Sequence, residues 1–191
     1  MKKLLCIVGM TASGKDTLAG YLSEKYGLRQ VVSYTTRPKR TYEQDGKEHY
    51  FITPEQVEEV KRQSNIVAYT RIGPVEYFAT EEELMNSDIY IIDPMGVSYL
   101  KNYIYSNDLP LELSVIGLKV PFLDMYRRAK ERGDDPEVFF KRSDSEMDEF
   151  ISFFNKVGTL DYLFINDKGI DALQRFGDYI YEKEVAKCSN D

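Results

Sequence analysis

Short apolar runs alternate with helical patterns along most of the chain. The apolar run 4–8 precedes a loop of small residues and then a helical pattern over 15–26, in which Leu18, Ala19 and Leu22 share one side. A strand, a glycine-containing loop and a helix in this order are typical of the start of an α/β unit. Further apolar runs predict four more strands of a central parallel sheet, over 30–34, 88–93, 111–120 and 162–165.

Helical patterns follow the later strands. We expect helices over 95–105 and 121–132, over a long segment after the polar stretch 133–137, and over 170–185. The alternation of strands and helices predicts an α/β fold class with a central parallel five-stranded sheet.

The region 33–87 has a different pattern. One helix is predicted over 54–63, with Thr53 as its N-cap and a proline in its first turn. Turn signals rich in glycine and proline separate short strand patterns, predicted over 49–52, 66–71 and 75–79. We interpret this region as a small antiparallel insertion within a single domain.

The composition is that of an ordinary globular domain. The 191 residues are 42% hydrophobic and 30% charged, which excludes collagen-like, disordered and disulfide-framework proteins. No apolar run approaches the roughly 18 residues of a membrane span, so we expect no membrane partner. The first apolar run is short and continues into a glycine loop, which predicts a strand rather than a signal peptide.

Cysteine and histidine usage favours a reduced, cytoplasmic protein without zinc. Cys6 and Cys188 lie far apart and have no metal-ligand spacing. His49 is the only histidine, so a zinc site of histidine and cysteine is not expected.

The charge distribution is uneven. The net charge of −7 argues against general binding of nucleic acid through its phosphates. It does not exclude a small polyanionic ligand, because clusters of basic residues set the local potential. Two clusters stand out: Arg37, Lys39 and Arg40, and then Arg127, Arg128, Lys130 and Arg132, continued by Lys141 and Arg142.

Residues 9–17 read GMTASGKDT and fit the phosphate-loop pattern G-x-x-x-x-G-K. Glycine and small residues let backbone N–H groups approach phosphate oxygens, and the following helix adds its positive amino-terminal end. The Lys15 ammonium supplies a cation near the phosphoryl group that is transferred. The pattern predicts a site for a nucleoside triphosphate, formed by Gly9, Thr11, Ala12, Ser13, Gly14, Lys15, Asp16 and Thr17.

One position departs from the usual phosphate loop. Asp16 follows the lysine, where the pattern has a serine or threonine hydroxyl that binds magnesium. A carboxylate oxygen is also a competent ligand for Mg²⁺, and Thr17 offers a hydroxyl next to it. We predict a Mg²⁺ cofactor here, and whether Asp16, Thr17 or water completes its shell stays open.

The segment 33–52, SYTTRPKRTYEQDGKEHYFI, predicts a second phosphate site. Arg37 and Arg40 are three residues apart in it, and guanidinium groups bind phosphate through paired hydrogen bonds while staying charged. The segment resembles the acceptor motif of guanylate kinases, in which T-T-R is followed by a basic residue, an acid, Gly, Tyr and Phe at fixed spacings. Here Thr35, Thr36, Arg37, Arg40, Glu43, Gly46 and Phe51 fill the motif, with Ser33 ahead of it.

The resemblance continues in order through DPMG at 93–96, the arginine-rich segment and IND at 165–167. It implies a cytoplasmic, ATP- and Mg²⁺-dependent phosphoryl transfer from ATP to GMP or dGMP, which yields ADP and GDP or dGDP. No general base is needed, because the acceptor phosphate is already anionic. It also implies a P-loop NTPase three-layer fold with a core (1–32, 88–131 and 143–191), an acceptor-nucleotide-binding insertion (33–87) and a helical lid (about 132–142).

The resemblance also assigns roles to single residues. Ligands of the acceptor nucleotide would be Ser33, Arg37, Arg40, Tyr77, Thr80 and the aromatic position near His49 and Tyr50. Asp93 would contact the base of this nucleotide. Catalytic cations would be Lys15, Arg37, Arg128, Arg132 and Arg142, and Asn166 would contact the adenine of ATP. The alternative roles are a helix cap for Asp93 and a turn residue for Asn166, and Arg127 competes with Arg128 for the lid role, so these alternatives stay open.

The departures from the family pattern concern the acceptor. His49 stands where the family has a tyrosine, and a shift of one residue would present Tyr50 instead. The family's guanine-reading glutamate has no counterpart near Val67 and Ala68, and Glu76 is a candidate substitute. The main alternative is therefore a kinase of the same fold with another nucleoside monophosphate acceptor. A non-catalytic binding module is less favoured, because the phosphate loop is intact apart from one position.

Overall fold

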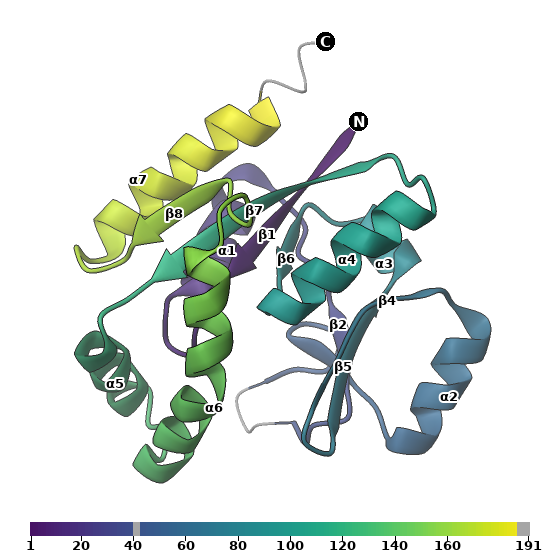
Figure 1. The fold of residues 1–191 in the computed structure, drawn as a ribbon, viewed down its shortest axis with the longest axis horizontal. Helices are drawn as coiled ribbons and strands as arrows, with labels where there is room; N and C mark the ends of the chain where they lie inside the picture. Colours follow the sequence, from purple (N-terminus) through teal and green to yellow (C-terminus); the bar gives the residue numbers. More distant parts are fainter. Residues whose placement is uncertain (40–42, 187–191) are drawn as a thin grey trace.

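The computed structural model describes residues 1–39 and 43–186, so the predicted acceptor residue Arg40 lies outside the described residues. Four parallel strands form the central sheet in the order β6-β1-β7-β8 (Figure 1). Each overlaps one of the predicted apolar runs, which confirms the parallel sheet. The bounds are Lys2–Val8 for β1, Ile89–Ile91 for β6, Leu111–Lys119 for β7 and Tyr162–Ile165 for β8.

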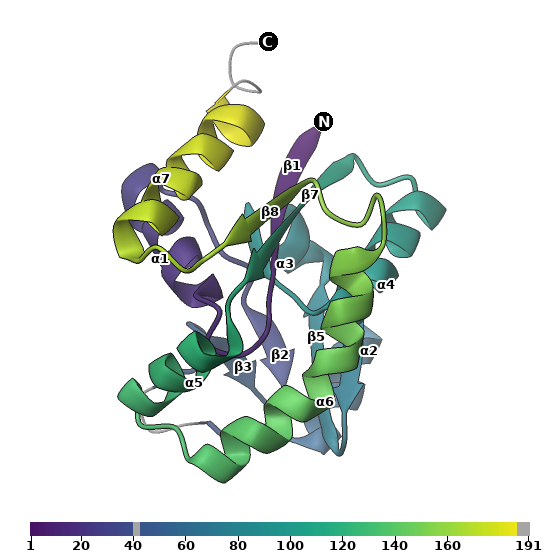
Figure 2. The same cartoon turned by 60° about the vertical axis from the view of Figure 1, so that its left-hand side comes forward.

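Helices cover both faces of this sheet, which gives the predicted three layers (Figure 2). α1 (Lys15–Tyr26) and α7 (Ile170–Ile180) pack together on one face, and α4 (Pro94–Ser106) and α6 (Pro136–Asn155) cover the other. α7 continues into a π-helical turn, η1 (Tyr181–Val185). The helix predicted over 170–185 therefore forms, but its hydrogen bonding changes in its last part.

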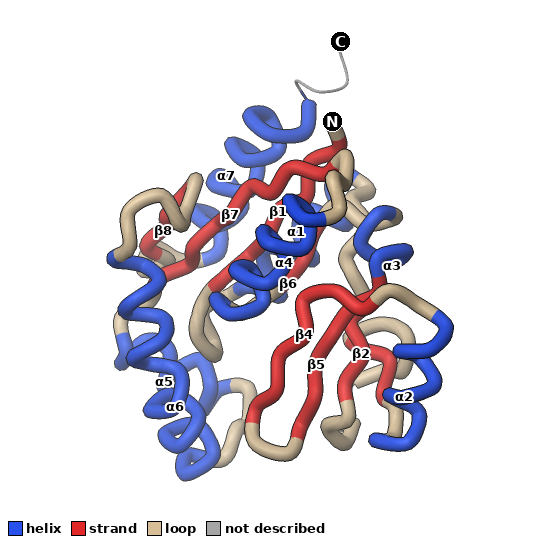
Figure 3. The backbone as a smooth tube through the Cα atoms, turned by 45° about the vertical axis from the view of Figure 1, so that its right-hand side comes forward, coloured by secondary structure: helices blue, strands red, loops and turns tan. Residues whose placement is uncertain are grey.

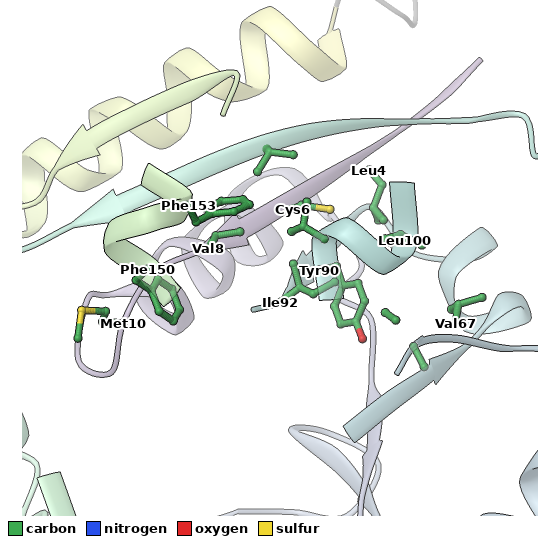
Figure 4. Packing of buried hydrophobic residues seen from close by; sticks show 14 of the residues in the cluster. Leu4, Cys6, Val8, Met10, Val67, Tyr90, Ile92, Leu100, Phe150 and Phe153 are labelled. Carbon is green, nitrogen blue, oxygen red and sulfur yellow. The ribbon is translucent and has the colours of Figure 1, made fainter. Parts of the chain in front are cut away.

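Alternation along β1 divides the core between the two faces. Leu4, Cys6 and Val8 pack on the side of α4 and α6 (Figure 4), whereas Leu5 and Ile7 pack on the side of α1 and α7. All of these side chains are fully buried, as expected for a strand that is covered on both faces. Burial of each large apolar side chain contributes roughly 1.5–3 kcal/mol to stability. The two faces are completed by Tyr90, Leu100, Phe150 and Phe153 on the first side and by Leu18, Leu22, Leu173 and Ile180 on the second.

The predicted fifth strand, over 30–34, does not join the parallel sheet as a strand. Gln30 forms only an isolated parallel bridge to Ile89, and the Val31 N–H donates to the Ile89 carbonyl oxygen at 2.8 Å. The chain then leaves this edge and enters β2 (Ser33–Thr35) of a second sheet. The prediction of five strands is therefore wrong by one. The strand-like residues 30–34 are divided between the two sheets. Their local sequence pattern does not show where the chain passes from one sheet to the other.

The insertion forms a second four-stranded sheet in the order β3-β2-β5-β4 (Figure 3). β4 (Ile66–Ile72) and β5 (Val75–Thr80) form a hairpin, and β5 also pairs antiparallel with β2. β3 (His49–Phe51), however, pairs parallel with β2, so the sheet is mixed rather than antiparallel as predicted. A tight hairpin loop would enforce antiparallel pairing, whereas a connection as long as 36–48 also allows parallel pairing.

Two helices belong to the insertion. α2 (Pro54–Gln63) has the predicted bounds, and the predicted N-cap Thr53 forms a capping box with Gln56. The apolar pattern does not predict α3 (Glu81–Met85), because its 5 residues are too few for a periodic signal. Its N-cap is Thr80, whose Oγ1 accepts from the Glu83 N–H at 3.3 Å.

α5 (Phe122–Glu131) lies beside the first half of α6, outside the parallel sheet (Figures 1 and 2). Aromatic side chains join the two helices, with ring centroids 5.6 Å apart for Tyr126 and Phe139 and 5.2 Å apart for Tyr126 and Phe140. The predicted lid, about 132–142, corresponds to their connection and the first turns of α6. Within the described residues, no helix combines the length and the apolar character that crossing a membrane requires.

Candidate functional site

The loop between β1 and α1 has the backbone of a phosphate cradle. Gly14 has a φ of 96° and Ala12 a φ of 54°, and left-handed residues of this kind turn N–H groups toward a common centre. A Cβ atom at Gly9 would lie 2.5 Å from the Ser13 Oγ and 2.8 Å from the Leu118 carbonyl oxygen. Only glycine fits that position, which explains the first glycine of the pattern.

Lys15 folds back over this loop. Its Nζ donates to the carbonyl oxygens of Gly9 at 2.7 Å and of Met10 at 2.9 Å. Burial lowers the pKa of Lys15 to about 8, while the Asp16 carboxylate opposes this shift and Arg142 adds to it. A bound phosphate would add negative charge and stabilise the ammonium form.

Asn166, which directly follows β8, and Arg128 of α5 lie beside the loop. Asn166 is 3% exposed, and its Nδ2 donates to the Ser13 carbonyl oxygen at 2.9 Å. Arg128 Nη2 in turn donates to the Asn166 carbonyl oxygen at 2.7 Å. Arg127 instead pairs with Asp124 at 2.8 Å and leaves 65% of its side chain exposed. Arg128 is therefore the one of the two arginines that lies at the phosphate loop. The contact of Asn166 with adenine stays a prediction.

The residues predicted to hold magnesium lie in the first turn of α1. Asp16 and Thr17 are both exposed there, and their carboxylate and hydroxyl oxygens are the donor types that Mg²⁺ prefers. Within the described residues, no three or more His, Cys, Asp or Glu side chains form a group that could hold a metal ion. The oxygens of Asp16 and Thr17 fit a Mg²⁺ that also binds the nucleotide phosphates, as is usual for this cation.

On the insertion, Arg37 is held in place before any acceptor binds. Its guanidinium forms paired bonds to Glu43, with Nη1 at 2.9 Å from Oε2 and Nη2 at 2.8 Å from Oε1. It also lies over the ring of Phe51 at 5.4 Å, and the Arg37 N–H donates to the Thr35 Oγ1 at 3.1 Å. The acid of the acceptor motif thus orients the arginine. The side chain of Glu43 is only 5% exposed.

His49 joins the same face of the insertion sheet. Its Nδ1 lies 2.8 Å from the Ser33 Oγ, and its ring meets the ring of Tyr77 edge-on with centroids 6.1 Å apart. Tyr50 does not join this group. Neighbouring residues of a strand point to opposite faces, and the ring of Tyr50 packs 4.7 Å from that of Tyr34. The structure thus favours His49 over Tyr50 at the aromatic position of the motif.

Asp93 bridges the core and the insertion. Its Oδ1 accepts from the Gly96 N–H at 2.6 Å, which caps α4, and the Thr70 Oγ1 lies 3.4 Å from the same oxygen. Thr70 is 5% exposed and follows a bulge at Ala68, which has a φ of 53°. The capping alternative for Asp93 is therefore realised, and the carboxylate still lies against the insertion. Thr80, predicted at the acceptor, has its hydroxyl engaged in capping α3.

The guanine-reading acid is not replaced from within the insertion sheet. Val67 and Ala68 are buried in the apolar core. Glu76 lies next to Tyr77 on β5 and hence on the opposite face, where it accepts from the Tyr69 hydroxyl. The hypothesis that Glu76 substitutes for the missing glutamate therefore has no support in this arrangement. Thr70 is the polar side chain of β4 that reaches Asp93.

The donor and acceptor groups influence one another. Burial lowers the pKa of His49, the charge of Arg37 lowers it further, and the carboxylates of Glu43 and Asp16 oppose the shift. Asp16 directly follows Lys15 on α1. That the sites around Lys15 and Arg37 face each other stays a prediction.

The two remaining predicted cations belong to the α5–α6 region. Arg132 pairs with Asp134, its Nε lying 3.0 Å from the Asp134 Oδ1. Arg142 Nε donates to the Glu146 Oε1 at 2.6 Å, and both arginines contribute to the pKa of Lys15. Glu146 is a residue that the sequence patterns miss. The signal was its position four residues after Arg142, which places both on one face of a helix.

Comparisons with known proteins agree with this geometry. The family model described as guanylate kinase matches residues 1–88, which contain the phosphate loop and the acceptor insertion. A guanylate kinase of Granulibacter bethesdensis is 30% identical over 176 residues, covering 85% of this chain and 76% of that protein. A guanylate kinase of Blochmanniella floridana is 28% identical over 201 residues, covering 97% and 90%. The crystal structure of guanylate kinase from Anaplasma phagocytophilum has a similar fold, with a TM-score of 0.67 at 18% identity, over 98% of this chain and 88% of that one.

Proposed function

The chain belongs to the guanylate kinase family, and we propose on this basis that it transfers the γ-phosphoryl group of ATP to GMP or dGMP, giving ADP and GDP or dGDP. It is an ATP-dependent nucleoside monophosphate kinase of the P-loop class. The proposal is supported by two fixed cations: Lys15, whose Nζ folds over the loop onto the Gly9 and Met10 carbonyl oxygens, and Arg37, held by paired bonds to Glu43.

The chain's own residues act mainly by positioning and by neutralising charge. The loop amides and Lys15 hold the donor phosphates. Arg37, fixed by Glu43, grips the acceptor phosphate, and Ser33 with His49 lies beside it. Arg128, Arg132 and Arg142 lie on the α5–α6 side, where they would cover the charge that develops in the transition state. Mg²⁺, when bound with ATP, would neutralise phosphate charge, and Asp16 and Thr17 would be the residues that hold it.

A specific observation supports an alternative choice of acceptor base. Val67 and Ala68 bury apolar side chains where the family has its guanine-reading acid. Loss of a buried hydrogen-bonding partner lowers discrimination between substrates. A kinase of the same fold with a wider choice of nucleoside monophosphates is therefore the second candidate. The cytoplasmic location suggested by the cysteine usage also stays a proposal.

An acceptor panel tests the proposal. ADP release from ATP and Mg²⁺ would be measured with GMP, dGMP, AMP, CMP, UMP and dTMP as acceptors. We expect GMP and dGMP to react fastest, and near-equal rates for all acceptors would favour the second candidate. Lys15→Ala and Arg37→Ala should each remove most of the turnover in a folded protein. Near-normal turnover in either variant would contradict the scheme, and calorimetric absence of ATP binding by the wild type would indicate a non-catalytic module.

A further inference from the structure

A carboxylate from α6 occupies part of the phosphate loop. The Thr11 N–H donates to the Glu146 Oε2 at 3.0 Å, across 135 residues of sequence. The other carboxylate oxygen, Oε1, accepts from Arg142 Nε at 2.6 Å. Glu146 also contributes to the pKa of Lys15, by opposing the effect of burial. The Glu146 side chain therefore connects the Thr11 amide with Arg142 and lies near Lys15.

The ion pair of Arg142 with Glu146 alone would be unremarkable. Pairs four residues apart are common on exposed helix faces and stabilise by only a few tenths of a kcal/mol. The bond to Thr11 is different, because Thr11 is 5% exposed and lies in the loop that binds phosphate. The side chain of Glu146 is itself only 18% exposed, against 48% for Arg142. Its carboxylate is therefore turned inward to the loop rather than toward solvent.

The donors that hold this carboxylate are those that recognise a phosphate oxygen. A loop N–H and a guanidinium group both bind anions, and a phosphate-loop amide is arranged for that purpose. Glu146 supplies two oxygens and one negative charge to these donors. It also brings a negative charge into a site that must accept a triphosphate, and like charges in one site repel.

We propose that Glu146 is a positioning residue of the donor site: it holds the Thr11 amide and Arg142 in place, and a phosphate oxygen of ATP displaces it when the nucleotide binds. This inference rests on the proposed function. Before ATP binds, the carboxylate keeps the loop amide satisfied and keeps Arg142 beside the loop. When ATP binds, both donors pass to the nucleotide, and Glu146 moves away.

The proposal predicts the direction in which removal of the Glu146 charge changes the affinity for ATP. Displacing a charged hydrogen-bond acceptor consumes part of the binding free energy of ATP. Removing the charge of Glu146 should therefore strengthen ATP binding. A residue that only stabilised the loop would have the opposite effect, because its loss would loosen the site and weaken binding. The direction of the change thus separates a displaced residue from a merely structural one.

The test measures ATP binding by calorimetry, in the absence of an acceptor, for the wild type and for Glu146→Gln, Glu146→Ala and Asp148→Asn. Asp148 is an exposed acid on the same helix, so its variant controls for the change in net charge. We expect the Kd for ATP to fall about tenfold in Glu146→Gln, the factor that one charged hydrogen bond provides. The fall should be at least as large in Glu146→Ala, because alanine cannot accept from Thr11, and the Kd should stay within about twofold in Asp148→Asn.

Kinetics supply a second readout. KM for ATP should fall in Glu146→Gln, in the same direction as the Kd, because the substituted side chain no longer competes with the nucleotide for the Thr11 amide and Arg142. An unchanged or higher Kd for ATP in both Glu146 variants would overturn the inference, and so would an equal gain in Asp148→Asn. The failure of the proposed function is distinguishable, since the wild type itself would then bind no ATP or transfer no phosphoryl group.

Discussion

The side-chain amide of Asn166 donates to the carbonyl oxygen of Ser13 at 2.9 Å, across 153 residues of sequence. Asn166 follows the end of β8, and Ser13 lies in the phosphate loop after β1. A Cβ atom at Gly14 would lie 2.7 Å from the same Asn166 Nδ2. The second glycine of the loop therefore leaves room for the amide that supports it.

Loss of this amide should weaken both the fold and the donor site. In Asn166→Ala the buried Ser13 carbonyl loses its partner, which costs about 1–3 kcal/mol. We expect a lower Tm and a higher Kd for ATP. In Asn166→Asp two oxygens would face each other, so the loss should be larger. Asn155→Ala, at the exposed end of α6, is the control. Wild-type Tm and Kd in Asn166→Ala would show that the loop holds its shape without this bond.

The lowered pKa of Lys15 predicts proton uptake when ATP binds. Burial places this pKa at about 8 rather than 10.5, so the amine is largely neutral at about pH 9 in the free protein. The triphosphate favours the ammonium form, and binding should therefore take up a proton above about pH 8 and weaken as the pH rises. Calorimetry at about pH 9 in two buffers of different ionisation enthalpy measures the uptake. The Lys15→Gln variant should show none from this group.

The same shift has a consequence for stability without ligand. The folded state disfavours the charged form of Lys15, so the unfolded chain binds more protons between about pH 8 and 10.5. The contribution of Lys15 to the free energy of unfolding should therefore rise with pH between about pH 8 and 10.5. Below about pH 8, the full destabilisation caused by burying the charged amine should be present. Denaturant unfolding at several pH values, for wild type and Lys15→Gln, isolates this contribution. A difference that does not change across the window would contradict the pKa.

Local chemistry made part of this structure predictable. The helix over 15–26 begins and ends where the sequence pattern places it, because Gly14 and Gly27 adopt left-handed conformations at its two ends. The helix over 54–63 is equally well marked by Thr53. In both cases the signal lies within a few residues of the element that it determines.

Contacts between distant segments were not predictable in the same way. The bond between Thr11 and Glu146 spans 135 residues, and no local pattern shows which helix reaches the loop. The short strands β2 and β3 carry no local signal that distinguishes parallel from antiparallel pairing, and the structure pairs them parallel. The choice between Arg127 and Arg128 depends on helix rotation, since neighbours point in different directions around a helix. These features depend on how the helices and strands pack together in three dimensions, which the local sequence patterns do not show.

Arg37 should not tolerate replacement by lysine. Its planar guanidinium matches both oxygens of Glu43 and can present further N–H groups to a phosphate, whereas lysine offers a single point charge. We expect Arg37→Lys to raise KM for the acceptor by roughly tenfold or more, with little change in KM for ATP. Arg62→Lys, at an exposed position of α2, should behave as the wild type. An unchanged acceptor KM in Arg37→Lys would mean that only the charge at this position matters.

Asp93 combines a structural role with the predicted contact to the acceptor base, and two variants separate them. Asparagine caps helices about as well as aspartate, so Asp93→Asn should keep the bond to the Gly96 N–H and a near-wild-type Tm. It loses the negative charge, however, and its amide adds donors where the N–H groups of guanine need acceptors. KM for GMP should therefore rise by roughly tenfold or more. Asp93→Ala should lower Tm as well, by removing a cap worth about 0.5–2 kcal/mol. If Asp93→Asn keeps the wild-type KM for GMP while Asp93→Ala loses stability, Asp93 only caps α4, and the base must be recognised elsewhere.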